Sequence, residues 1–309
     1  MAEETQKDMQ KVHAGEATRE TKHVAKRVAI QGERGSNSHM AALEMLRGEE
    51  IEIVPCSVSA EVIEAVVRGT VDAAVLPIEN SLHGSVAEHY DLLMAQPVRI
   101  ERESLMRIRH NLIAAPGVKL EDVRWVLSHP VALSQCRAYL AGMQRSRAVS
   151  FYDTAGSVKH VMAEGLLDSA GVAPELAAQE YGAEVLVRGI EDHAENYTRF
   201  HLLRAVDSAA QPMRGEAAHG WGTQGAVDKM SVAFAVEHRP GTLVRALQAL
   251  AEAGVDLTQI ESRPVPGTPW EYVFYVDLRI ADAAMADAAL AALGPHCGMV
   301  KELGRYRAA

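Results

Sequence analysis

Three loops of the sequence place small and polar residues where an anion could be bound. They occupy residues 32–38 (GERGSNS), 77–85 (PIENSLHGS) and 127–135 (LSHPVALSQ), and each lies between an apolar strand-like run and a helical pattern. In open α/β sheets the carboxyl ends of strands line the ligand crevice, and helix N-termini there present free N–H groups. Three such loops suit a ligand with more than one carboxylate, although a Ser or Asn at any single helix start is more often only a cap.

A fourth segment, ENYTRFHLL at residues 195–203, brings Asn196, Thr198 and Arg199 to the head of an apolar strand. Thr198 could act in catalysis, but threonine is also a favoured strand residue, and Arg199 could be a surface ion-pair partner of little energetic weight. Spacing alone leaves these alternatives open.

Motifs for cofactors are absent from the sequence. It contains no GxxxxGK[ST], HExxH or GxSxG pattern, and its 13 histidines show no metal-ligand spacing. The GxGxxG string at residues 220–225 lies in an aperiodic segment without the strand and helix pattern that a dinucleotide site needs. His83 and His129 fall near the proposed pocket and could equally be structural. We therefore expect neither a metal nor any other cofactor.

Composition narrows the class of protein. The chain has 309 residues, 48% hydrophobic and 23% charged, which suits two or three globular domains. A net charge of −10 argues against nucleic-acid binding, and no apolar run approaches the length of a membrane helix. The scattered Cys56, Cys136 and Cys297 favour a reducing compartment, and residues 1–27 lack the apolar core of a signal peptide, so we expect a cytoplasmic protein with a solvated tail.

The order of the elements predicts how the loops are positioned. A βαβαβα rhythm over residues 27–93 indicates a mainly parallel sheet with flanking helices. Residues 98–116 look extended and long enough to cross to a second α/β lobe, whose pattern runs to residue 206. Residues 207–227 have no periodicity and read as a linker. Beyond them the order is βαββαβ, which is the ferredoxin-like arrangement.

Read together, the motifs LPIENSLHGSV, SHPVALSQCRAYL, NYTRFHLL, RPGTLVRAL and IESRP resemble those of prephenate dehydratases that carry a regulatory ACT domain. The resemblance extends from Val28 to about Tyr306. It implies an α/β fold: a two-lobed catalytic domain like type II periplasmic binding proteins at residues 28–206, and a ferredoxin-like βαββαβ ACT domain at residues 228–306. The implied reaction converts prephenate to phenylpyruvate with loss of carbon dioxide and water. With no chorismate mutase domain before Val28, a monofunctional enzyme is expected.

The resemblance also assigns residues. Thr198 falls on the catalytic threonine, and L-phenylalanine is the expected effector. The implied substrate-binding residues are Gly35, Ser36, Ser38, Glu79, Asn80, Ser81, Ser128, Gln135, Arg199 and Phe200, with Gly32 in the first loop. The implied effector-binding residues are Gly241, Thr242, Leu243, Asp256, Leu257, Glu261, Ser262, Arg263 and Pro264. Glu33, Thr242 and Asp256 depart from the family pattern, and the last two leave the identity and sign of the effector open.

The chemistry of the implied reaction explains why uncharged hydrogen-bond donors suit the site. Prephenate is a dianion, and the barrier lies in expelling hydroxide, which one donated proton or hydrogen bond assists by about 10²–10⁴-fold. A hydroxyl such as Thr198 can donate without adding charge beside a dianion. Three alternatives remain: arogenate dehydratase, a non-catalytic solute-binding protein, and a catalytically inactive amino-acid sensor. A homodimer or homotetramer formed through ACT domains is expected.

Overall fold

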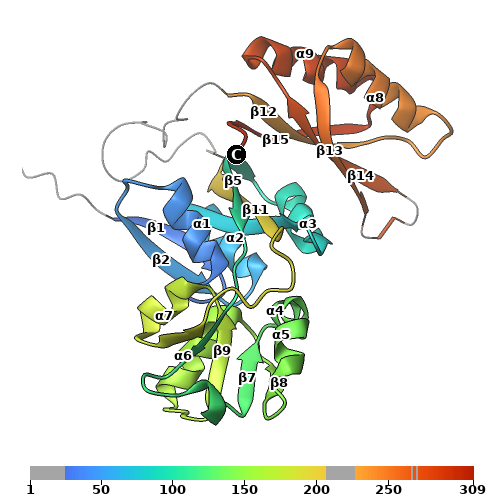
Figure 1. The fold of residues 1–309 in the computed structure, drawn as a ribbon. Helices are drawn as coiled ribbons and strands as arrows, with labels where there is room; N and C mark the ends of the chain where they lie inside the picture. The colour runs from blue at the N-terminus through green and yellow to red at the C-terminus, as the bar shows by residue number, and fades with distance from the viewer. Residues whose placement is uncertain (1–24, 207–226, 266, 269–270) are drawn as a thin grey trace, which may run out of the picture.

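The computed structural model describes residues 25–206, 227–265, 267–268 and 271–309. The tail expected before residue 25 and most of the linker expected at 207–227 lie outside the described residues. Three units follow one another down the molecule in Figure 1: a C-terminal domain at the top, lobe 1 beneath it, and lobe 2 at the bottom. Lobe 1 comprises residues 25–107 and 197–206, lobe 2 comprises residues 108–196, and the C-terminal domain comprises the described residues from 227 on.

Lobe 1 is a mixed sheet covered by helices. Its strand order is β2-β1-β3-β11-β5, and among these five strands only β11 runs in the opposite direction, antiparallel to both β3 and β5. The strands are β1 (Lys26–Gln31), β2 (Ile51–Cys56), β3 (Ala73–Asn80), β5 (Val98–Arg107) and β11 (Tyr197–Ala205), with the short β4 (Gly84–Ser85) beside β3. The helices are α1 (Asn37–Met45), α2 (Ser59–Val67) and α3 (Ala87–Ala95).

Lobe 2 has a second five-stranded sheet in the order β10-β6-β9-β7-β8. Its strands are β6 (Asn111–Ala114), β7 (Trp125–Ser128), β8 (Arg147–Ser150), β9 (Ser169–Ala173) and β10 (Glu184–Val187). Its helices are α4 (Pro130–Gln135), α5 (Arg137–Gly142), α6 (Thr154–Ala163) and α7 (Glu175–Tyr181), with a short η1 (Leu120–Asp122).

The chain crosses between the lobes twice, once from β5 to β6 and once from β10 to β11 (Figure 1). The first crossing is the long extended segment predicted at residues 98–116. The two crossings meet where the Ile108 N–H donates to the Asn196 carbonyl at 2.7 Å. This junction is therefore also where the two lobes are tied together.

Two local expectations differ from the structure. The helix expected over residues 131–143 is divided into α4 and α5, because Cys136 takes φ −118° and ψ 21° rather than helical angles. The cap of α6 is Asp153 instead of Thr154, since the Asp153 carboxylate accepts the Gly156 N–H at 2.7 Å. Aspartate is as good an N-cap as threonine, and it lies one residue earlier.

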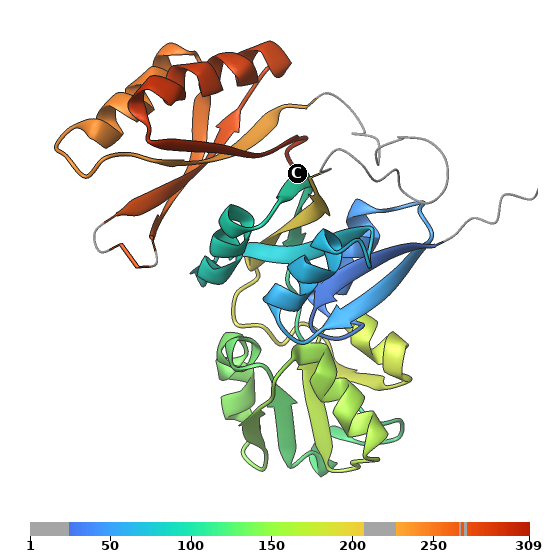
Figure 2. The same ribbon diagram turned by 180° about the vertical axis from the view of Figure 1, so that it is seen from behind.

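The C-terminal domain has the predicted βαββαβ order. Its antiparallel sheet runs β13-β14-β12-β15, and both long helices lie on the side of the sheet away from lobe 1 (Figures 1 and 2). The strands are β12 (Lys229–Ala235), β13 (Asp256–Pro264), β14 (Tyr272–Arg279) and β15 (Met299–Tyr306). The helices are α8 (Thr242–Glu252) and α9 (Ala283–Leu293), followed by η2 (Gly294–His296).

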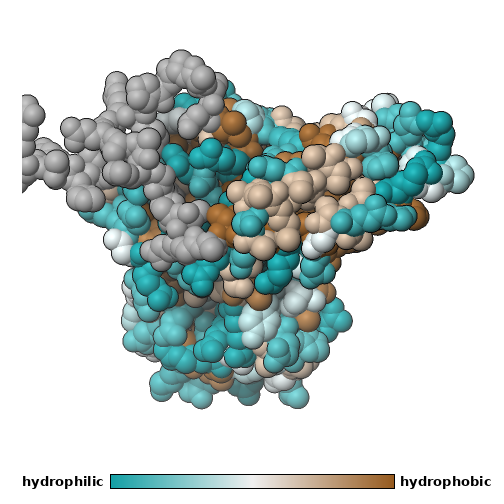
Figure 3. All heavy atoms as spheres, turned by 90° about the horizontal axis from the view of Figure 1, so that it is seen from above, coloured by the Kyte–Doolittle hydropathy of each residue, from teal (hydrophilic) through white to brown (hydrophobic). Residues whose placement is uncertain are grey.

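Alternation along the strands divides the apolar side chains between two cores. Met230, Val232 and Phe234 pack against the helices, whereas Ala233 and Tyr275 join the core of lobe 1. The sheet is therefore buried on both faces. From above, weakly hydrophobic residues gather in a tan band over this domain, where the alanine-rich α9 covers the sheet (Figure 3).

Strand β15 joins the C-terminal domain closely to lobe 1. A Cβ atom on Gly304, which has φ +157°, would lie 2.3 Å from the Ile100 carbonyl oxygen. The Lys301 ammonium donates to the carbonyls of Leu93, Met94 and Gln96 at 2.8–2.9 Å. These carbonyls belong to the last turn of α3 and the residue after it, so a lysine of the C-terminal domain completes the end of a lobe 1 helix. The chain end lies beside β5 (Figure 2), where Ala309 N–H donates to Glu103 at 3.3 Å.

Candidate active site

Thr198 and Asn80 are directly paired across two strands of lobe 1. Strands β3 and β11 run antiparallel with Thr198 opposite Asn80. The Asn80 amide nitrogen donates to Thr198 Oγ1 at 2.9 Å, and it also reaches Asn196 Oδ1 at 2.8 Å and the Tyr197 carbonyl at 3.1 Å. The Asn80 amide oxygen accepts the N–H groups of Leu82 and His83 at 3.0 and 3.1 Å. With donors on one side and acceptors on the other, the orientation of the amide is fixed by the network.

The Thr198 hydroxyl is prepared to donate. Its oxygen accepts from Asn80, and no acceptor for its own proton is found within the described residues. The residue is 8% exposed, so it is largely shielded from bulk water. A hydroxyl has one donor and two acceptor sites, and here only an acceptor site is used. The proton can therefore be donated to a ligand group that approaches the hydroxyl.

An irregularity in β3 sets this pairing. The register of β11 against β3 shifts between Arg199 and Phe200, so that Phe200 lies opposite Pro77. The Pro77 carbonyl accepts from Nδ1 of the buried His89, whose Nε2 accepts from the Ser59 hydroxyl at 2.7 Å. Burial lowers the pKa of His89 despite its bond to Pro77, which keeps the ring neutral and suited to this bridge.

Ser81 fastens the loop that follows β3. Its hydroxyl donates to the Glu195 carbonyl at 3.1 Å and accepts the Tyr197 N–H at 3.0 Å, while its own N–H donates to the Tyr197 carbonyl at 2.8 Å. These bonds hold the loop at residues 77–85 against the segment before Thr198. The structure therefore places Ser81 as a support for Asn80 and Thr198.

Lobe 2 reaches the same loop through Gln135. The amide nitrogen of Gln135 donates to Nδ1 of His83 at 3.1 Å, and its oxygen accepts from Nε2 of His110 at 2.7 Å. Burial lowers the pKa of His110, outweighing the bond to Gln135. The chain of hydrogen bonds from His110 through Gln135 to His83 thus joins the two lobes at the loop that carries Asn80.

Two residues at the crossing between the lobes were given no role by the sequence analysis: His110, which it did not single out, and Asn196, which it named only as part of the segment around Thr198. His110 Nδ1 and Asn196 Nδ2 are buried polar atoms without a hydrogen-bond partner among the described residues. Asn196 is fully buried and bonded to Asn80, so it belongs to the support of Thr198. Its position two residues before Thr198 was a usable signal, whereas His110 lies in the crossing strand, far from any motif.

The side chain of Ser128 is bonded inside the sheet of lobe 2. It is fully buried, and its hydroxyl donates to the Val172 carbonyl at 2.6 Å. The expectation that it donates to substrate finds no support in this arrangement, because its one proton is already used inside lobe 2.

The glycine-rich loop forms a seam between the lobes. Ser36 caps α1 by accepting the His39 N–H at 3.4 Å, and Ser38 is buried in the same helix. A Cβ on Gly35 (φ +81°) would lie 2.6 Å from Ala177 Cα of lobe 2, and one on Gly32 would lie 2.5 Å from the Asp153 carboxylate. The glycines are required for close contact with lobe 2.

Glu33 extends the same seam. Its carboxylate accepts from the Tyr152 hydroxyl at 2.8 Å and pairs with Lys159 at 2.9 Å. Both partners belong to lobe 2. The residue that departs from the family pattern in this loop is thus an inter-lobe contact, and burial together with Glu33 raises the pKa of Tyr152.

Three expected substrate contacts lie elsewhere. Phe200 is buried in the core of lobe 1, and the side chains of Glu79 and Arg199 meet each other at 3.3 Å beside the C-terminal domain. Successive strand residues face opposite sides of a sheet. Thr198 and Asn80 therefore lie on one face of the sheet, and their neighbours Arg199 and Glu79 lie on the face towards the C-terminal domain.

The residues assigned to effector binding fall into two groups. Gly241, Thr242 and Leu243 begin α8, where the Thr242 hydroxyl donates to the backbone of Glu237 and Arg239. The others follow one another along the edge strand β13: Asp256, Leu257, Glu261, Ser262, Arg263 and Pro264.

Two of the β13 residues contact lobe 1. Glu261 accepts from the Ser85 hydroxyl at 2.8 Å, and Arg263 pairs with Asp91 of α3 at 3.0 Å. Ser85 ends the loop at residues 77–85. The strand expected to bind the effector therefore touches the loop expected to bind the substrate.

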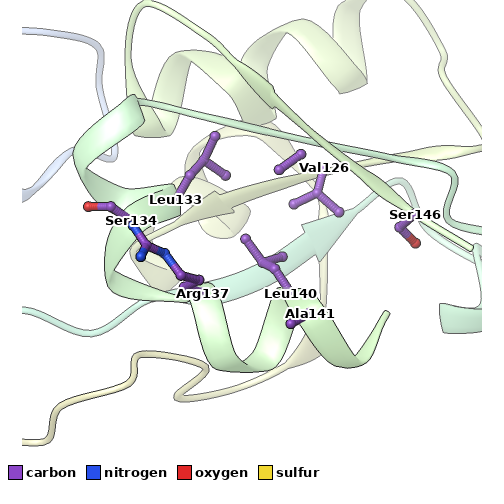
Figure 4. A pocket seen from close by; sticks show the side chains of 8 residues that line it. Val126, Leu133, Ser134, Arg137, Leu140, Ala141 and Ser146 are labelled. Carbon is purple, nitrogen blue, oxygen red and sulfur yellow. The ribbon is translucent and has the colours of Figure 1, made fainter. Parts of the chain in front are cut away.

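A surface hollow in lobe 2 is lined by none of these residues, although it lies beside the helix that ends at Gln135. A shallow, open pocket of about 440 Å³ lies in lobe 2 beside α4 and α5, and no residue assigned to the site lines it (Figure 4). Its side chains are mostly aliphatic. Across the ranges that the structure describes, no cluster of three potential metal ligands occurs, and no helix has the length and apolar character to span a membrane.

Comparisons with known proteins show which families the two parts of the chain resemble. A family model for prephenate dehydratase matches residues 28–208, and one for the ACT domain matches residues 230–293. The chain is 40% identical to arogenate dehydratase/prephenate dehydratase 2 of Arabidopsis thaliana, over 91% of this chain and 72% of that protein.

Two solved structures resemble the whole chain with a TM-score of 0.78. One is a prephenate dehydratase from Arthrobacter aurescens in complex with L-Phe, 31% identical and covering 92% of this chain and 90% of that one. The other is GqqA, described as a novel type of quorum quenching acylase, 32% identical and covering 92% and 98%.

Proposed function

Since the chain belongs to the prephenate dehydratase family and carries a C-terminal ACT domain, we propose that it converts prephenate to phenylpyruvate, releasing carbon dioxide and water, under the control of L-phenylalanine. The observation that carries the proposal is the hydrogen bond from Asn80 to Thr198 Oγ1, which leaves the threonine proton for a substrate oxygen. The division into a catalytic part and a regulatory part remains the one expected from the sequence.

The proposed chemistry needs one donor at the leaving oxygen. As the ring carboxylate departs as carbon dioxide, its bonding electrons enter the ring and the C–O bond to the hydroxyl breaks. The Thr198 O–H donates a hydrogen bond to that oxygen and stabilises the negative charge that develops on it, and a proton from solvent completes the water that leaves. Asn80 strengthens the donor by donating to the same threonine oxygen, and neither group adds charge beside the dianion.

The uncharged side chains around Thr198 suit a substrate that must lose one of its two carboxylates. Thr198 is bonded to Asn80, which is bonded to Asn196, and both are neutral amides. The Gln135 amide and the His110 imidazole, whose pKa burial lowers, contact the same loop through His83. An ion pair with the departing carboxylate would stabilise the ground state and slow its loss. The one strongly basic residue beside Thr198, Arg199, faces the other domain.

Arogenate is the alternative substrate. The similar Arabidopsis protein is named for both activities, and arogenate differs from prephenate by an ammonium in place of a keto group. Turnover of both substrates by the purified chain should be measured, following phenylpyruvate from prephenate and phenylalanine from arogenate. We expect a higher kcat/KM for prephenate; absence of phenylpyruvate from prephenate would refute the proposed function, and turnover of arogenate alone would favour the alternative.

An acylase function is less compatible with the geometry. An acyl-transfer nucleophile needs a base that accepts its proton. Thr198 instead accepts a bond from an amide, and within the described residues no side-chain base lies within hydrogen-bond distance of its proton. An acyl-amide substrate incubated under the same conditions should remain uncleaved.

Regulation, assembly and location complete the proposal. A relative of known structure was solved in complex with L-Phe, which supports phenylalanine as the effector here. We expect a homodimer or homotetramer, to be measured by light scattering, and a cytoplasmic protein, to be tested by cell fractionation. The free thiols Cys56, Cys136 and Cys297 are compatible with that location.

A further inference from the structure

Arg199 lies at the centre of a buried ionic cluster between lobe 1 and the C-terminal domain. Its guanidinium pairs with Asp277 of β14 and with Glu103 of β5, the latter at 3.3 Å. Lys229 of β12 joins both carboxylates at 2.7 and 3.2 Å. Burial lowers the pKa of Arg199, but the carboxylates, Asp277 first among them, outweigh burial and raise it, so the guanidinium stays charged.

The second nitrogen of the same guanidinium contacts Gln259. Arg199 Nη2 donates to the Gln259 amide oxygen, and it lies 3.3 Å from both the Tyr90 hydroxyl and the Glu79 carboxylate. Gln259 belongs to β13 of the C-terminal domain. Its amide nitrogen donates in turn to Glu79 and to Tyr90, both at 3.0 Å.

This arrangement links one side chain of the C-terminal domain to both halves of the catalytic pair. Arg199 follows Thr198 directly on β11, and Glu79 precedes Asn80 directly on β3. Gln259 bonds to Arg199 with its oxygen and to Glu79 with its nitrogen. A shift of β13 therefore pulls on the backbone next to Thr198 and next to Asn80 at the same time.

We propose that Gln259 and Arg199 are positioning residues, which transmit the position of β13 to the hydrogen bond between Asn80 and Thr198. The inference rests on the proposed function in that the signal on β13 is the effector. Glu261 to Pro264, the expected effector segment, begin two residues after Gln259 on the same strand. In this structure the bonds of Gln259 to Arg199 and Glu79 hold Thr198 against Asn80. Effector binding that moves β13 loosens the hydrogen bond between Asn80 and Thr198.

The test compares two isosteric substitutions. Gln259→Leu removes both amide bonds at the centre of the cluster. Gln248→Leu is the matched control, because Gln248 on α8 is exposed and bonds only to Glu252 in the described residues. Gln259→Leu should lower kcat about tenfold with little change in KM, as expected for the loss of a charge-assisted hydrogen bond. It should also abolish most of the response to phenylalanine, whereas Gln248→Leu should behave as the parent does.

Arg199→Lys provides a second variant that keeps the charge beside Asp277 but lacks the planar fork that reaches Gln259. It should reproduce both effects of Gln259→Leu. Parental kcat and parental phenylalanine response in both variants would overturn the inference.

A measurement without substrate separates the inference from the proposed function. Hydrogen exchange of peptides covering residues 76–86 and 195–201 should be faster in Gln259→Leu than in the parent, and unchanged in Gln248→Leu. If the parent turned over neither prephenate nor arogenate, the proposed function would fail, and the exchange difference would still decide the coupling. Equal exchange in all three proteins would refute it.

Discussion

The hydroxyl of Ser85 donates to the carboxylate of Glu261 at 2.8 Å, across 176 positions of the chain. One residue ends the loop that carries Asn80, and the other begins the strand segment expected to bind the effector. Substrate and effector elements are therefore in contact within one subunit, without an intervening domain.

Removing this contact should weaken effector control. In Ser85→Ala the phenylalanine concentration for half-maximal effect should rise about threefold, since a partly exposed bond of this kind contributes well under about 1 kcal/mol. Titration of activity with phenylalanine provides the measurement. Ser134→Ala, which removes a serine hydroxyl from the exposed side of α4, serves as the control and should leave the midpoint where it is.

Thr198→Ala should lower kcat by about 10²–10⁴-fold with a small change in KM, because the hydroxyl donor is used only as the leaving group departs. Thr198→Ser keeps the hydroxyl and should retain most of the activity. Steady-state rates of the variants on prephenate provide the measurement. An alanine variant as fast as the parent would show that Thr198 has no catalytic role.

Asn80→Asp should reverse the polarity of the key hydrogen bond. A carboxylate at this position can only accept, so the Thr198 proton would turn towards it and away from substrate. We expect kcat at pH 7 to fall at least about tenfold, with partial recovery as pH is lowered and the carboxyl group protonates. Asn80→Ala should lose activity with no such recovery, and identical pH profiles for the two variants would contradict this account.

Gly304→Ala should destabilise the junction of β15 and β5. The added methyl group would lie 2.3 Å from the Ile100 carbonyl oxygen at a backbone angle that L-residues rarely adopt, so a loss of about 1–3 kcal/mol is expected. Gly298→Ala meets no atom within 4 Å and should change stability by less than about 0.5 kcal/mol. Chemical denaturation of both variants tests the difference.

Stability should decline as pH falls below about 6.5. Burial lowers the pKa values of His39, His89, His110 and His201 in the folded chain from 6.5. Below pH 6.5 the unfolded chain therefore binds more protons, and unfolding becomes easier until pH reaches the lower folded values. Each histidine contributes a slope of at most about 1.4 kcal/mol per pH unit.

The carboxylates of Glu103 and Asp277 do not disturb this window. Burial raises the pKa values of Glu103 and Asp277, but nearby cations and His201 outweigh it and lower them below their ordinary values of 4.5 and 3.8. Their stabilising effect is present above those values and is lost only at more acidic pH. Denaturant unfolding at pH 8.0 and 5.5 should show the decline, and His201→Gln should reduce its slope, whereas the exposed His296→Gln should not.

The sequence was sufficient for the order of elements and for the central pair. Apolar runs and loop chemistry predicted two α/β lobes, a ferredoxin-like domain and the crossing at residues 98–116, and the family resemblance assigned Thr198 and Asn80 to one site. It could not predict the side to which Arg199 turns. Alternation along the strand places the side chains of Arg199 and Thr198 on different faces of the sheet. Only the folded C-terminal domain supplies Asp277, 78 positions later, as the partner of Arg199 on its face. Likewise, the inward bond of Ser128 and the break at Cys136 depend on packing between distant segments.

The three carbonyls that Lys301 satisfies have a consequence for biosynthesis. Helix α3 leaves the ribosome long before Lys301 does, because more than 200 residues separate them. The end of α3 in nascent lobe 1 is therefore incomplete until β15 has emerged, and we expect protease resistance of that lobe to develop only after β15 is available.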